Sequence, residues 1–159
     1  MKIEVDGAHS GIRFSSCHFI PGHEKCGRLH GHSYIIRMAV EGDIDPNGMV
    51  MDFMVLKKAL RAMVEELDHR VLLPSLSREL EMVQDDTSVR VLSRGKSYVF
   101  PREDVCLMEL ENTTAEEMSQ MMLSRLLDRV SFPAGVCSVS IGLDEERGQT
   151  AWATRRLRE

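Results

Sequence analysis

The chain has 159 residues, 43% of them hydrophobic and 28% charged, which is the size and balance of one globular domain without linkers. A formal net charge of -5 argues against a nucleic-acid partner, because nucleic-acid-binding proteins normally present a basic surface. No apolar run approaches the roughly 18 residues that cross a bilayer. The N-terminus also lacks the apolar core of a signal peptide, so we expect a cytoplasmic protein without a membrane partner.

The first part of the chain is predicted to be mostly extended. Side chains alternate over residues 2–6 and 11–20, and residues 33–42 form a run rich in β-branched and aromatic side chains. The sequence Asp-Pro-Asn-Gly at residues 45–48 predicts a turn, and residues 49–51 follow it as a short extended piece.

Two helices are predicted from the spacing of apolar residues. The first begins at Asp52, whose carboxylate can cap it, and continues with apolar residues three and four positions apart. It ends near Asp68 and His69, which an ordinary interpretation places at a solvated helix end. The second begins at Thr114, which forms a capping box with Glu117, and its regularly spaced methionines indicate core packing.

The middle of the chain, residues 75–105, is predicted to be an extension of the domain. It starts with a polar, irregular stretch, and residues 88–92 and 96–100 then predict a hairpin around a short turn. The remaining predicted strands span residues 105–110 and 136–143, and a last one begins at residues 151–153.

Three histidines form a candidate metal site. His30 and His32 lie on the same face of a strand, because side chains alternate with period two. If residues 11–20 pair antiparallel with the run that starts at Gly31, His18 faces the other two across the ladder. Three imidazoles without a fourth protein ligand suit a catalytic Zn²⁺ with an open position. Three imidazoles also accept other first-row ions, so the sequence does not fix the metal.

Two segments carry a resemblance to a known family. Phe-Ser-Ser-Cys-His at residues 14–18 and Cys-Gly-Arg-Leu-His-Gly-His-Ser-Tyr at residues 26–34 closely resemble the zinc and nucleophile motifs of the 6-pyruvoyltetrahydropterin synthase and 6-carboxytetrahydropterin synthase family. The resemblance covers residues 11–72 closely and residues 111–153 more loosely, and the extension looks like that of archaeal members. It implies one α+β domain over residues 1–159 with the tunnelling fold (T-fold), an antiparallel β-sheet with two helices packed on one face. It also implies a homo-oligomer, a trimer or hexamer with active sites at subunit contacts.

The resemblance implies catalytic roles for Cys26, Asp68 and His69. Cys26 is the candidate base, since a thiolate becomes available at neutral pH when a cation lies near the thiol. A fourth-ligand role for Cys26 would close the metal site and leave no position for substrate. In the family an Asp-His pair at the end of the first helix belongs to the catalytic machinery, in which Asp68 would orient the His69 imidazole.

Four further residues are candidates for binding the pterin. The resemblance places Thr114 and Glu116 near the pterin pocket, where a capping role for Thr114 can hold at the same time. It also implies an acidic residue near the end of the 136–143 strand, because a carboxylate can accept two parallel N–H bonds from the amino-pyrimidine edge. Asp144 and Glu145 are both candidates, and an interpretation as exposed acids in a turn stays open.

Three functions remain open. The first is a zinc-dependent carbon-oxygen lyase that converts 7,8-dihydroneopterin triphosphate to 6-pyruvoyl- or 6-carboxy-tetrahydropterin, with Arg28 and Lys25 as candidates to meet phosphate. The second is an aldolase-type enzyme that gives 6-hydroxymethyl-dihydropterin. The third is a metal-stabilised binding module without turnover. The retained cysteine in the Cys-x-x-x-His-Gly-His spacing favours the first.

Overall fold

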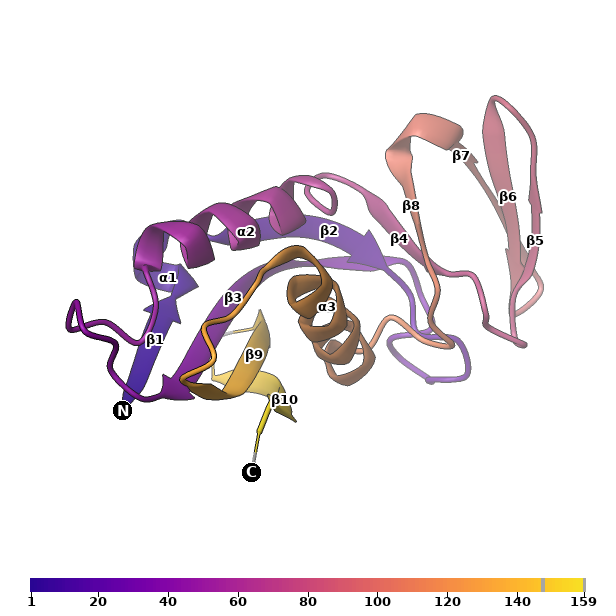
Figure 1. Cartoon of the computed structure of the whole chain (residues 1–159). Helices are drawn as coiled ribbons and strands as arrows, with labels where there is room; N and C mark the ends of the chain where they lie inside the picture. The colour runs from indigo at the N-terminus through magenta and orange to yellow at the C-terminus, as the bar shows by residue number, and fades with distance from the viewer. Residues whose placement is uncertain (147, 159) are drawn as a thin grey trace.

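The computed structural model describes residues 1–146 and 148–158. Its helices are α1 Gly7–Ser10, α2 Phe53–Glu65 and α3 Ala115–Arg129, with a 3-10 helix η1 Arg102–Asp104. The strands are β1 Lys2–Asp6, β2 Arg13–His18, β3 His30–Gly42, β4 Val71–Pro74, β5 Glu81–Gln84, β6 Ser88–Ser93, β7 Lys96–Pro101, β8 Val105–Met108, β9 Val136–Glu146 and β10 Gln149–Arg156. Figure 1 shows the α+β arrangement, with long curved strands behind two main helices and the extension on one side.

The main sheet is mixed rather than antiparallel throughout. Its strand order is β10-β9-β3-β2-β4-β8, and β1 also pairs with β3. The pairs among β1, β2, β3, β9 and β10 are antiparallel as predicted, whereas β4 is parallel to both β2 and β8. Each of β4 and β8 returns to the sheet after a long crossover connection, which is how parallel neighbours are joined. The predicted α+β fold is confirmed, and the predicted antiparallel pairing holds in this sheet except for the two pairs that β4 makes.

Helices α2 and α3 cover one face of the sheet, as predicted. Leu56, Leu60 and Met63 of α2 share a single buried cluster with Met118 and Met122 of α3 and with inward side chains of the central strands. The third helix, α1, was not predicted, because one turn is too short to show a periodic pattern. Within the described residues, no helix is long and apolar enough to cross a membrane.

The boundaries of α2 follow its capping chemistry. The Asp52 carboxylate accepts a hydrogen bond from the backbone of Met54 at 2.7 Å, so the predicted cap is confirmed. The predicted extended piece at residues 49–51 was wrong. The Asp45 side chain accepts hydrogen bonds from the backbone of Asn47 and Met49, and these bonds hold the approach to the helix in a turn.

The extension forms its own three-stranded sheet, β5-β6-β7, at one end of the molecule (Figure 1). The predicted hairpin is confirmed as β6 and β7, and its two turn residues, Arg94 and Gly95, have φ values of 53° and 73°. Positive φ at both positions is the geometry that suits a two-residue hairpin turn. Strand β5 was missed, because three of its four side chains are exposed and give no hydrophobic alternation. A second buried cluster joins the extension to β4 and β8.

Candidate active site

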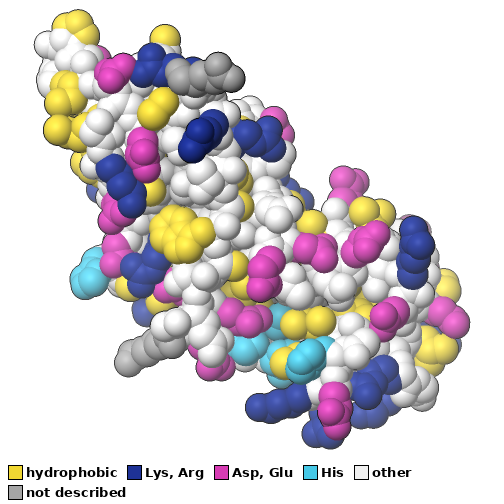
Figure 2. Space-filling view, turned by 90° about the horizontal axis from the view of Figure 1, so that it is seen from below, with side chains coloured by type: hydrophobic (Ala, Val, Ile, Leu, Met, Phe, Trp, Pro, Cys, Tyr) yellow, Lys and Arg dark blue, Asp and Glu magenta, His cyan; other side chains and the backbone are white. Residues whose placement is uncertain are grey.

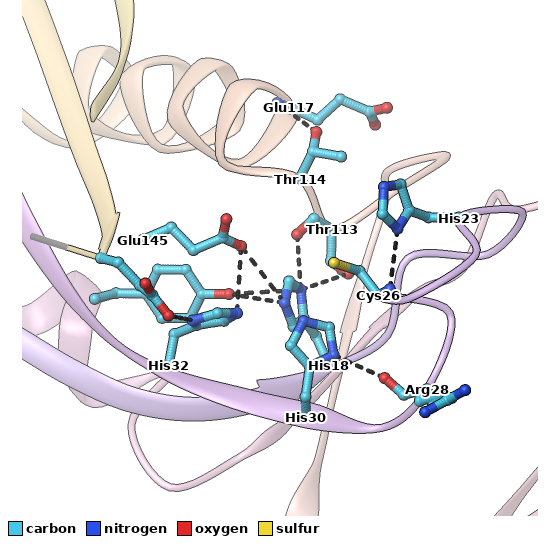
Figure 3. Close-up of polar contacts among 12 residues, drawn as sticks. His18, His23, Cys26, Arg28, His30, His32, Thr113, Thr114, Glu117 and Glu145 are labelled. Carbon is cyan, nitrogen blue, oxygen red and sulfur yellow. Dashed lines mark hydrogen bonds and ion pairs between the residues drawn. The ribbon is translucent and has the colours of Figure 1, made fainter. Parts of the chain in front are cut away.

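The structure brings the three predicted histidines together on the helix-covered face of the sheet. His18 of β2 lies directly opposite His30 of β3, and His32 follows two positions along β3 on the same face. One ligand-capable atom from each residue lies within 4.8 Å of those of the other two. Figure 3 shows the three rings converging beside the start of α3.

Hydrogen bonds fix the orientation of the rings. The Nδ1 atom of His18 donates to the carbonyl oxygen of Thr113 at 2.9 Å, and that of His30 donates to the carbonyl oxygen of Arg28 at 2.7 Å. Because a carbonyl oxygen can only accept, Nδ1 carries the proton in both rings, and a neutral ring then has a free lone pair on Nε2. Backbone carbonyls commonly orient metal-binding histidines in this way. The rings are therefore arranged to present Nε2 to a common ligand.

A bound cation would satisfy polar atoms that lack partners in the described chain. The Nε2 atom of His32 and the Oε1 atom of Glu145 are buried and have no hydrogen-bond partner there. This Glu145 oxygen lies 3.5 Å from Nε2 of His18 and 3.7 Å from Nε2 of His32. Unpartnered buried polar atoms are costly, and nitrogen and carboxylate oxygen are ligands that Zn²⁺ accepts. The residues present therefore fit a divalent metal such as zinc.

The protonation state of His18 also suits a metal ligand. Burial, together with the neighbouring His30, lowers the pKa of His18 to about 4. His18 is thus neutral at physiological pH, which is the form that coordinates a metal.

Tyr34 is part of this site and was missed from the sequence. Its hydroxyl lies 3.3 Å from Nε2 of His18, and its ring stacks on Phe14 with centroids 4.8 Å apart. Burial raises the pKa of Tyr34 above its usual range, so the hydroxyl keeps its proton and can donate it in a hydrogen bond. The signal was present in the sequence, since Tyr34 continues the period-two series of His30 and His32.

Cys26 lies on the loop that connects β2 to β3. Its backbone N–H donates to Nδ1 of His23 at 2.9 Å, and its carbonyl accepts from Ile20 at 2.8 Å. The side chain is half-buried, and in Figure 3 its sulfur points in the direction of Thr113 and His18. These backbone bonds fix the loop that carries the thiol.

Asp68 and His69 form a pair beside β2, on the segment that leads into β4. The Asp68 carboxylate accepts from the backbone of Ser15 at 2.8 Å and pairs with Nδ1 of His69 at 2.8 Å. The Ser15 hydrogen bond and the His69 imidazole lower the pKa of Asp68. The His69 side chain is 82% exposed and borders a cavity that Ser15, Cys17 and His32 also line. The described contacts of this pair within one chain do not include Cys26.

The start of α3 brings the Glu116 carboxylate to a cavity next to Glu145. Thr114 accepts a hydrogen bond from the backbone of Glu117 as predicted, at 3.3 Å. The reciprocal half of the capping box differs, because the Glu117 carboxylate accepts from the backbone of Glu111 and Asn112 instead. Glu116 borders a cavity of about 540 Å³ that Glu145 also lines. The structure therefore brings two of the four predicted pterin-binding residues to one cavity.

A β-bulge at Glu145 interrupts strand β9 directly after Asp144. Along the β9–β10 ladder, Gln149 pairs with Glu146 and Thr150 pairs with Asp144, so Glu145 is the extra residue. Bulges redirect side chains, and here Glu145 faces the histidines. Asp144 is buried in an ion pair with Arg37, with Nε–Oδ distances of 3.0 and 3.1 Å, and it also accepts from the Thr150 hydroxyl. The structure therefore places Glu145 at the site and Asp144 away from it.

Separate substitutions of Asp144 and Glu145 test which of the two carboxylates belongs to the site. Asp144→Asn is expected to lower the free energy of unfolding by about 1–3 kcal/mol, because it weakens a charge-assisted contact to Arg37. Glu145→Gln is expected to reduce turnover about tenfold or more, while the free energy of unfolding changes by less than about 1 kcal/mol. Urea unfolding and steady-state kinetics on both variants measure the two effects. A raised KM for Asp144→Asn together with unchanged kinetics for Glu145→Gln would make Asp144 the substrate contact.

Comparisons with known proteins match nearly the whole length of the chain. The family model described as 6-pyruvoyl tetrahydropterin synthase matches residues 9–156. A protein of Methanocaldococcus jannaschii that carries the name of a 6-carboxy-5,6,7,8-tetrahydropterin synthase is 32% identical over 154 residues, or 95% of this chain and 94% of that protein. The crystal structure of 6-pyruvoyl tetrahydropterin synthase from Plasmodium vivax has a TM-score of 0.92 at 25% identity and covers 99% of this chain and 98% of that one. The dihydroneopterin monophosphate aldolase of Pyrococcus furiosus is 49% identical over 47 residues, 30% of this chain and 40% of that protein.

Proposed function

Because the chain belongs to the 6-pyruvoyl tetrahydropterin synthase family, we propose that it is a zinc-dependent lyase acting on 7,8-dihydroneopterin triphosphate. Its product would be a 6-pyruvoyl-tetrahydropterin, formed by removal of a carbon-bound proton and loss of triphosphate, or a 6-carboxy-tetrahydropterin, whose formation also releases the two outer side-chain carbons as a separate fragment. The observation that carries this proposal is the convergence of His18, His30 and His32 beside the unpartnered carboxylate of Glu145. A zinc ion held there would act as a Lewis acid toward the oxygens of the substrate side chain.

The cavity next to the histidines supports a pterin as the bound molecule. Glu116 and Glu145 line it from two different elements, and Trp152 adds an aromatic surface. A carboxylate can accept two parallel N–H bonds from an amino-pyrimidine edge, and an aromatic ring can stack on a flat heterocycle. Either carboxylate can therefore orient the pterin with its side chain toward the histidines.

Cys26 is the proposed base. It lies on the loop that leads directly into His30, so a substrate whose side chain reaches the histidines also comes close to this thiol. Proton transfer by a well-placed group contributes about 10²–10⁴ in rate. The buried hydroxyl of Tyr34 remains protonated and is a hydrogen-bond donor at the same place.

We propose that Asp68 and His69 serve the Cys26 of a neighbouring subunit. The pair is ordered by hydrogen bonds, yet the His69 ring is almost entirely exposed, and the described contacts of the pair within one chain do not include Cys26. The outer strands of the main sheet, β10 and β8, each pair on one side only in the described chain. Exposed strand edges favour association. A homo-oligomer with sites at subunit contacts, a trimer or hexamer, would use both features.

An aldolase-type reaction is the second candidate. The relative named dihydroneopterin monophosphate aldolase matches this chain at 49% identity, but only over 47 residues. Both reactions would use the same metal site and base, so the histidine geometry does not separate them. The interpretation as a binding module without turnover assigns no role to the half-buried thiol of Cys26.

Product analysis distinguishes the candidates. The zinc-loaded protein is incubated separately with 7,8-dihydroneopterin triphosphate, its monophosphate and unphosphorylated dihydroneopterin, and the products are identified by mass. We expect conversion of the triphosphate with release of inorganic triphosphate. Formation of 6-hydroxymethyl-dihydropterin would select the aldolase reaction, and no conversion of any substrate would select the binding module.

A further inference from the structure

The extension is fastened to the loop that carries Cys26. One guanidinium nitrogen of Arg94, at the tip of the β6–β7 hairpin, donates to the carbonyl oxygens of His23 and Glu24, each at 2.9 Å. The fit is close, because a Cβ atom on Gly27 would collide with both the His23 carbonyl and the Arg94 guanidinium. A residue some 70 positions away thus holds the turn that precedes Cys26.

A basic cavity lies between this hairpin and the loop. It has a volume of about 350 Å³ and is lined by Glu24, Gly27, Arg28, Arg94 and Lys96, three cations against one carboxylate. The hydrogen bonds of Arg94 go to neutral carbonyls and leave its charge uncompensated. The ion pairs found among the described residues use other arginines and lysines, namely Lys2, Arg37, Arg125, Arg129 and Arg158. The cavity therefore carries excess positive charge in a chain whose net charge is -5.

The cavity adjoins the histidine cluster through a single residue. The carbonyl of Arg28 accepts from Nδ1 of His30, while the Arg28 side chain lines the cavity. Gly27, on the cavity wall, directly follows Cys26. Figure 2 shows Lys and Arg side chains gathered next to the exposed histidine surface. The cavity therefore lies against the loop that carries Cys26 and leads into His30.

We propose that this cavity binds the phosphate chain of the pterin substrate, and that the extension supplies Arg94 and Lys96 as specificity-determining residues. The proposal rests on the proposed function, in which the phosphates are attached at the end of the short side chain that faces the histidines. Guanidinium groups bind phosphate oxygens through paired hydrogen bonds, and an ammonium group adds a mobile charge. Arg94 also fixes the Cys26 loop, so phosphate binding and the position of the thiol are linked through one side chain.

Inorganic tripolyphosphate tests the cavity without any reaction. Calorimetric titration of the zinc-loaded protein is expected to show binding that weakens about tenfold in Lys96→Gln and about tenfold in Arg28→Gln, the loss typical of one charged hydrogen bond. Both side chains are exposed, so the fold is expected to persist. Lys58→Gln, an exposed lysine of α2, is the matched control and should bind like the unmodified protein. Zinc content is measured after each titration, because tripolyphosphate also chelates metal.

Kinetics connect the cavity to the substrate. Lys96→Gln should raise KM for 7,8-dihydroneopterin triphosphate about tenfold, since it removes one charged contact to the phosphate chain. Unchanged tripolyphosphate affinity and unchanged KM in Lys96→Gln would overturn the cavity assignment, although turnover itself would uphold the proposed function. Tripolyphosphate binding that depends on Lys96, in a protein that converts no pterin, would support the cavity and contradict the proposed reaction.

Discussion

His30→Ala is expected to remove the metal and abolish turnover. The variant deletes one of three convergent imidazoles, and its partner group, the carbonyl of Arg28, stays near solvent on an exposed loop residue. We expect the zinc content of the purified protein to fall from about one ion per chain to below about one-tenth. Turnover should fall by about three orders of magnitude or more, since a Lewis acid contributes several kcal/mol. Metal analysis by mass spectrometry and a kinetic assay measure both effects.

A second histidine provides the matched control. His9 lies on α1 with a side chain that is 88% exposed, so His9→Ala should retain both zinc and turnover. Circular dichroism checks that His30→Ala keeps its fold, which we expect because His30 is only half-buried. Equal zinc content in His30→Ala and the unmodified protein would contradict the three-histidine site.

The histidine cluster could be predicted because it depends on local backbone geometry. Alternation along a strand places His30 and His32 on one face, and antiparallel pairing of neighbouring segments brings His18 opposite His30. The two main helices could also be predicted, because their apolar periodicity and the capping residues Asp52 and Thr114 are local features of the sequence. These features need no knowledge of distant contacts.

Other parts of the site depend on tertiary structure and could not be predicted from the sequence. The choice between Asp144 and Glu145 is made by a bulge at the β9–β10 turn, which breaks any counting of alternation back from Trp152. The carbonyl of Thr113 orients His18 from 95 residues away, and any residue type supplies a carbonyl. The parallel pairing of β4 also needs the path of the chain over the sheet, which alternation does not encode.

Cys26→Ala is expected to reduce kcat about 10²–10⁴-fold while zinc stays bound, because the thiol supplies proton transfer and not a metal ligand. Its neighbours hold the loop through backbone atoms of Cys26, which the exchange leaves in place. The control is Cys137→Ala on β9, whose thiol donates to the Glu41 carbonyl at 3.4 Å and lies outside the histidine cluster. It should retain full turnover. Unchanged turnover in Cys26→Ala would remove the thiol from the mechanism, and loss of zinc would make it a ligand.

Mixing two inactive variants tests whether Cys26 and His69 of one site come from different chains. If Cys26 of one chain works with His69 of its neighbour, hetero-oligomers of Cys26→Ala and His69→Ala chains contain some sites with both native residues. Refolding an equal mixture should then restore activity to about one site in four, since each of two chains must independently supply its native residue. Activity no greater than that of the separate variants would place both residues in a site within one chain. Such a result would require the exposed His69 ring to reach Cys26 of its own chain.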